Sequence, residues 1–245
     1  MKLLKHIVLS VATVMVALLF MSATKDELRL VLQFHSVVNG RVLSLDTATY
    51  TNAVCQTFNV TKFKYYISDI KLTDVNGKEY CDSNSYLIDE DDPDSKKVIL
   101  HLVPQANYKQ ISFLIGVDSL HNCSGAQEGA LDPMHGMFWT WNTGYIFMKL
   151  EGRSPESKAT VHLLEYHIGG YKAPANCIRR VTLTFPAVIN PLTTNGYTIH
   201  IDADAGEVLK TPTAIDFSKM PAVTDFHNAE TIATNYSDMF SLSTR

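Results

Sequence analysis

The chain has 245 residues, of which 46% are hydrophobic and 19% are charged, and its formal net charge is −4 at pH 7. This composition is typical of a globular protein with a substantial core, and it excludes collagen-like and low-complexity chains. The negative charge argues against a nucleic-acid-binding protein, because binding to a phosphate backbone needs a basic surface.

Residues 1–23 have the pattern of a secretory signal peptide. Lys2 and Lys5 give a positively charged start, residues 7–20 are almost entirely apolar, and small residues follow at positions 22–24. A transmembrane anchor needs about 20 apolar residues, which is more than this stretch offers, so cleavage is expected after Ala23. We therefore predict a periplasmic or secreted protein, free of the membrane after signal removal, with one domain at residues 25–245.

Alternation of apolar and polar residues dominates the rest of the chain and predicts β-strands. Asn-Gly pairs at positions 39–40 and 76–77 predict tight turns. The expected strands, in chain order, are 28–34, 42–45, 63–72, 98–102, 111–117, 145–151, 161–168, 178–185 and 197–202. About ten short strands with almost no helical periodicity between them predict an all-β fold, an antiparallel two-sheet β-sandwich.

One segment near the end has helical spacing instead. Ile232, Tyr236, Met239 and Phe240 fall at i, i+4, i+7 and i+8, and Asn228 is a suitable N-cap. We predict a short C-terminal helix over residues 232–240 that packs against the sandwich.

Export also decides how the cysteines are interpreted. An oxidising compartment favours disulfide bonds, no CxxC pair is present, and the cysteine spacings match no zinc-binding template. Four cysteines allow three connectivities. We favour Cys55–Cys81 and Cys123–Cys177, because each bridge would brace a loop against a neighbouring strand.

No nucleophile–base motif of a hydrolase and no phosphate-binding loop is present, so we do not expect an enzyme. Histidines from different strands are the best candidate metal ligands, since imidazole suits copper. His200 shares a polar face with Asp202, a carboxylate that could orient it. His35 and His167 each lie toward the end of a predicted strand.

The segment ALDPMHGMFWTWNTGYIFMKLEG, residues 130–152, holds both tryptophans of the chain. It resembles the signature of the MbnP-like copper-binding domain family almost letter for letter. The resemblance extends to FKYYISDIKL at residues 63–72, to YHIGGYKAPANC at residues 166–177 and to the closing IATNYSDMF, so it spans most of the chain after the signal.

This resemblance implies an exported β-sandwich protein that holds or delivers copper. It further implies copper ligation by histidines together with a kynurenine, which a di-haem partner of the cytochrome c peroxidase type makes by oxidising a tryptophan. Carried over to this chain, Trp139 or Trp141 is the modified residue, His200 is the best-placed ligand, and His35 and His167 are further candidates. The alternative is an interaction or electron-transfer docking module that binds no metal.

Overall fold

The computed structural model describes residues 29–139, 144–173, 175–191 and 196–244. The predicted signal peptide and Trp141 lie outside these residues. Within them, no helix is long and apolar enough to cross a membrane.

The first sheet has five strands and contains both ends of the described chain. Its order is β15–β13–β1–β2, and β6 pairs with the other edge of β1. Its strands are β1 (Leu30–Val38), β2 (Arg41–Val42), β6 (Lys97–Leu100), β13 (Tyr197–Asp204) and β15 (Phe240–Leu242).

The second sheet has eight strands and is built around β4, the longest strand at 18 residues. Its order is β12–β7–β4–β8–β9–β14, with β3 and β5 also paired to β4. Its strands are β3 (Tyr50–Thr51), β4 (Thr57–Asp74), β5 (Glu79–Asp89), β7 (Tyr108–Ile115), β8 (Ile146–Arg153), β9 (Leu163–Gly169), β12 (Arg179–Ile189) and β14 (Ala222–Val223).

The remaining elements are short. A two-stranded hairpin joins β10 (Tyr171–Lys172) to β11 (Ala175–Asn176), the helices are α2 (Ser119–Cys123) and α3 (Ala229–Tyr236), and single 3₁₀ turns lie at Gly129–Leu131, Pro133–His135, Thr160–His162 and Glu207–Leu209.

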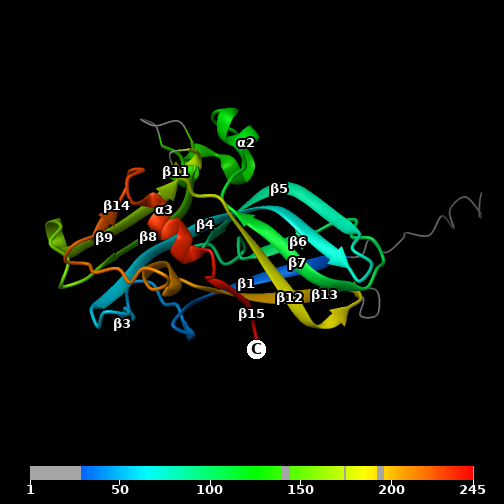
Figure 1. Ribbon diagram of the computed structural model, residues 1–245, viewed down its shortest axis with the longest axis horizontal. Coiled ribbons are helices and arrows are strands. Elements are labelled where there is room, and N and C mark those ends of the chain that lie inside the picture. Colours follow the sequence, from blue (N-terminus) through cyan, green and yellow to red (C-terminus); the bar gives the residue numbers. More distant parts are fainter. Residues whose placement is uncertain (1–28, 140–143, 174, 192–195, 245) are drawn as a thin grey trace, which may run out of the picture.

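The two sheets face each other across one hydrophobic core. Phe34 of β1 is 1% exposed and makes edge-to-face contacts with Tyr65 of β4 and Phe113 of β7, at ring-centroid distances of 6.2 and 6.3 Å. Phe240 of β15 packs against the same rings. In Figure 1 the strands β1, β13 and β15 run below β4 and β7, and α2 lies on the far side of the upper layer. The predicted β-sandwich is therefore confirmed as an architecture.

The expectation of purely antiparallel sheets is wrong at two places. Strand β1 pairs with β13 in parallel, and so does β9 with β14. The described residues also form more strands than the predicted ten, because several two-residue strands and the polar strand β5 join the sheets. Parallel pairing of the first long strand with a late one places residues 30–38 beside residues 197–204, which becomes important for the histidines.

The C-terminal helix is shorter than predicted and begins earlier. Helix α3 ends at Tyr236, and Phe240 starts strand β15, where it pairs with Ala203. Met239 and Phe240 continue the apolar spacing because they are buried in the same core, at 1% and 5% exposure. The apolar spacing therefore indicates which of these residues are buried, but it does not indicate where the helix ends. Asn228 precedes the helix, but its side chain makes no capping hydrogen bond.

Candidate functional site

Two of the three predicted metal ligands meet on the outer face of the five-stranded sheet. On β1 the residues Leu32 and Phe34 are buried, so His35 points away from the core, and on β13 the burial of Ile199 and Ile201 turns His200 outward. The parallel register sets Gln33 beside His200 and His35 beside Asp202. The two histidines are thus diagonal neighbours on adjacent strands.

The imidazole rings of His35 and His200 are in direct contact. Nε2 of His35 lies 3.0 Å from Nδ1 of His200, with 5.2 Å between the ring centroids and 20° between the ring planes. One of these nitrogens carries the shared proton and the other accepts it. A metal ion with bonds of about 2.0–2.1 Å to nitrogen holds two tetrahedral ligands roughly 3.3 Å apart. A metal ion can therefore replace the proton with only a small separation of the rings.

His200 is exposed and lines a cavity of about 390 Å³ that opens between β12, β13 and β15. The walls of this cavity combine apolar side chains, such as Phe185, Ile189 and Leu242, with polar ones, such as Asn190 and Thr198. The histidine pair is consequently accessible from the surface on the His200 side.

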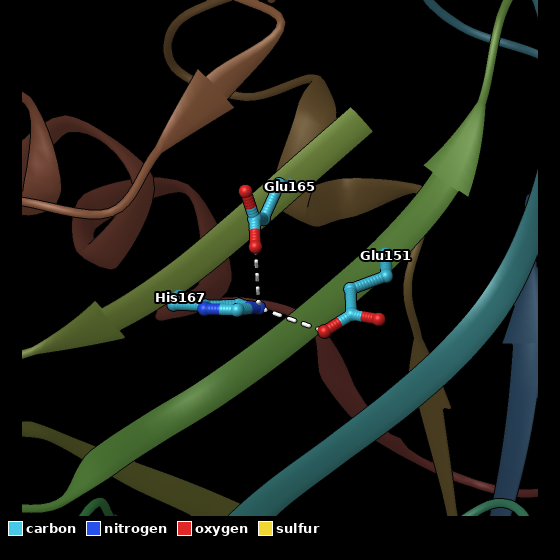
Figure 2. A group of neighbouring side chains, drawn as sticks. All are labelled: Glu151, Glu165 and His167. Atoms are coloured by element: carbon cyan, nitrogen blue, oxygen red, sulfur yellow. Dashed lines mark hydrogen bonds and ion pairs between the residues drawn. The ribbon is translucent and has the colours of Figure 1, made fainter. Parts of the chain in front are cut away.

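His167 lies elsewhere, on the outer face of the eight-stranded sheet. Its Nε2 is 2.8 Å from Oε1 of Glu151 on β8 and 3.7 Å from Oε1 of Glu165 on its own strand (Figure 2). The ladder between β8 and β9 pairs Glu151 with Glu165 and Lys149 with His167, so all four side chains share one face. Lys62 of β4 adds an ion pair to Glu151 at 3.4 Å.

The two histidine sites are on opposite sides of the molecule. Leu150 and Tyr166, which alternate with Glu151 and His167, lie on the same face of the sheet as Phe63 and therefore line the core. The sheets of a sandwich are about 10 Å apart, and both sites lie beyond that distance on outer faces. His167 therefore cannot share a metal ion with the pair formed by His35 and His200.

Trp139 also lies on the His167 side. The indole is 6% exposed and packs directly over Gly169, where an added Cβ would be 2.7 Å from its Cζ3 atom, and against the ring of Phe226. Gly169 is two residues after His167, on the same face of β9. Trp139 and His200 therefore cannot hold the same copper ion, although the resemblance to the family implied shared ligation by a histidine and a modified tryptophan. Trp139 also lies before β8 begins, outside any regular strand.

The signature segment around Trp139 covers this outer face before it enters β8. Met137 is fully buried, the carbonyl of Gly136 accepts a hydrogen bond from Lys149 at 2.6 Å, and Tyr66 donates one to the carbonyl of Ala130 at 3.0 Å. Residues 130–139 thus form a packed layer on the sheet that contains His167.

All four cysteines are free thiols in this structure, so neither predicted disulfide is formed. Cys55 lies two residues before β4, whereas Cys81 on β5 pairs with Lys71 near the other end of that 18-residue strand. At about 3.3 Å per residue this separates them by tens of ångströms, far more than the ~6 Å between Cα atoms that a disulfide allows. Cys123 is exposed, with its Sγ 3.4 Å from the Tyr171 hydroxyl, while Cys177 is buried and burial raises the pKa of its thiol to about 12.

The Glu151 carboxylate predicts a specific pH dependence. Its hydrogen bond with His167, aided by Lys62 and Lys149, lowers its pKa from 4.5 to about 2. A pKa that is lower in the folded state stabilises the fold above about pH 4.5, and this contribution disappears as the pH falls toward 2. We expect Glu151→Gln to lower the urea midpoint by a constant amount above about pH 5, and by progressively less toward pH 2. An equal deficit at both ends of this range would contradict the ion-pair role of Glu151.

The fold and its histidines define the class: a β-sandwich with potential metal ligands on its outer faces. The MbnP family matches residues 27–227, and the chain belongs to this family, which is linked to copper handling by methanobactin. Among solved structures, MbnP from Methylosinus trichosporium is similar, with a TM-score of 0.53 and 17% identity over 77% of this chain and 79% of that chain. Nothing among the curated proteins matches the chain.

Proposed function

We propose that this protein is an exported copper-binding protein that holds copper between His35 and His200 and passes it on. The observation that carries this proposal is the contact between the two imidazoles, with ligand nitrogens 3.0 Å apart on adjacent strands. We further propose that the protein acts by binding and not by catalysis.

Imidazole nitrogen is a ligand that copper accepts readily, whereas carboxylates suit harder cations. The pair on β1 and β13 offers two imidazoles, and the cluster around His167 offers one imidazole and two carboxylates. Family membership supports copper, and this ligand chemistry favours the histidine pair over the cluster. Exposure of His200 beside an open cavity suits a site from which copper is transferred to another molecule.

The oxidation of a tryptophan by a di-haem partner of the cytochrome c peroxidase type is also part of this proposal. Trp139 lies on the opposite outer face from His200, so a kynurenine at this position would not be a ligand of the histidine pair. If Trp139 is the residue that is oxidised, we expect co-expression with such a partner to change the intact mass without changing the copper affinity of the pair. A rise in that affinity after co-expression would contradict this separation of the two sites.

The copper proposal predicts the effect of removing one imidazole. The full chain, stripped of metal, is expected to bind one equivalent of Cu(I) in a titration against a chromophoric chelator. His200→Ala and His35→Ala are each expected to weaken binding by about 100-fold, because loss of even an outer-shell partner costs about 10–100-fold. His101→Ala, which removes an exposed histidine away from both sites, is the matched control. Equal affinities of His200→Ala and His101→Ala would refute the assignment.

The second candidate function is a docking module that binds no metal. It is favoured by two large apolar side chains that project from the layer over the eight-stranded sheet, Leu120 at 73% exposure and Met134 at 90% exposure. If the wild-type chain binds no copper, but Met134→Ser weakens capture of the di-haem partner, this alternative replaces the copper proposal.

A further inference from the structure

Two carboxylates and one imidazole gather on the outer face of the eight-stranded sheet, at Glu151, Glu165 and His167. Glu151 and Glu165 are direct cross-strand neighbours in the ladder between β8 and β9. Like charges placed directly opposite each other destabilise an antiparallel pair. His167 adds its Nε2 to the same point, and the three ligand atoms lie within 4.8 Å of one another (Figure 2).

Two lysines, Lys62 and Lys149, lie next to this cluster. Lys62 contacts Oε2 of Glu151, while Oε1 is the atom that faces His167. Lys149 is 3.9 Å from Oε1 and directs its ammonium group to the carbonyl of Gly136 at 2.6 Å. Among the described residues, Glu165 forms no ion pair with a lysine or arginine. The two lysines thus form ion pairs with Glu151, whereas Glu165 has only a longer-range electrostatic interaction with Lys149.

We propose that Glu151, Glu165 and His167 form a second metal site, which binds one Zn²⁺ ion independently of copper. Zinc takes histidine nitrogen and carboxylate oxygen as ligands, and three protein ligands leave a fourth position for water. Separations of 2.8 and 3.7 Å from Nε2 to the two oxygens bracket the roughly 3.3 Å expected between tetrahedral ligands. The cation also removes the repulsion between the two opposed carboxylates.

The backbone that carries Glu151, Glu165 and His167 is regular β-sheet. All three residues lie in regular strands of the central part of the eight-stranded sheet, and each side chain is partly buried. Because the site needs little rearrangement, metal binding is expected to raise the thermal midpoint of the whole domain.

The test uses the full chain stripped with EDTA, with zinc chloride as the probe and Co²⁺ as a spectroscopic substitute. We expect one equivalent of Zn²⁺ to raise the midpoint, and Co²⁺ to give the visible bands of a tetrahedral site. Glu165→Gln and His167→Ala are expected to weaken zinc binding at least 10-fold. Glu79→Gln, which alters a carboxylate paired with Lys71 elsewhere in the same sheet, is the control.

The double variant His35→Ala/His200→Ala separates this inference from the copper proposal. It is expected to keep zinc binding and the Co²⁺ bands while losing copper, and loss of zinc binding in it would overturn the inference. So would a wild-type chain without a Zn²⁺-dependent midpoint, or a Glu165→Gln variant that binds zinc as tightly as Glu79→Gln. None of these three results decides whether copper binds at the histidine pair.

Discussion

Replacing Gly152 by alanine is expected to destabilise the fold by about 3 kcal/mol. Gly152 closes the signature segment and lies in β8 between Val60 of β4 and Leu164 of β9. A Cβ at this position would overlap the carbonyl oxygen of Asn59 and lie 3.1 Å from the carbonyl carbon. These are backbone atoms of the paired strand, so no rotamer change relieves the overlap, and the ladder between β4 and β8 must separate.

The measurement is urea unfolding followed by circular dichroism. Gly136→Ala is the control, because it lies in the same signature segment with open space around it and a left-handed φ of 69°. Its expected cost is about 1 kcal/mol, from the strained backbone alone. Comparable losses in the two variants would mean that the close approach of β4 to β8 is not what Gly152 permits.

Truncation of Phe34 to alanine is expected to cost about 3–5 kcal/mol. The ring lies at the centre of the interface between the sheets, within 6.3 Å of the ring centroids of Tyr65, Phe113 and Phe240. Removal of the ring leaves a cavity between the two sheets. The cavity can shrink only if strands of both sheets move inward, and their hydrogen-bonded ladders oppose this movement.

The same unfolding experiment measures this effect, with Val42→Ala as its control. Val42 is a 63% exposed residue of the same sheet, and its truncation is expected to change stability by less than about 0.5 kcal/mol. A loss below about 1 kcal/mol for Phe34→Ala would contradict the packing of the two sheets against each other across this ring.

The strands that alternate clearly could be predicted from the sequence, and with them the side of each strand that faces solvent. His35, His167 and His200 all lie on outer faces, as the alternation indicates. Alternation does not reveal which strand lies beside which. The parallel pairing of β1 with β13 joins residues 167 positions apart and brings His35 into contact with His200, 165 positions later in the chain. For the same reason, alternation does not reveal that His167 lies in the other sheet.

Strand β5 was missed because its composition is polar. The sequence EYCDSNSYLID has few apolar residues, and most of its side chains are exposed or only partly buried. It is a strand because β4 extends far enough to pair with it from Thr73 to Lys64. That pairing also places Cys81 far from Cys55, and the positions of the cysteines in the sequence do not reveal this separation. The sequence also does not reveal the site of Glu151, Glu165 and His167, since its two glutamates become neighbours only through the β8–β9 register.

Nuclear magnetic resonance of the imidazole nitrogens is the direct test of copper binding between His35 and His200. Cu(I) is diamagnetic, so the ¹⁵N signals of the histidines can be followed in the full chain before and after one equivalent is added. We expect large shifts of Nε2 of His35 and Nδ1 of His200, the two atoms that lie 3.0 Å apart, with His167 unchanged. A shift of His167 in place of this pair, or no shift of any histidine, would contradict it.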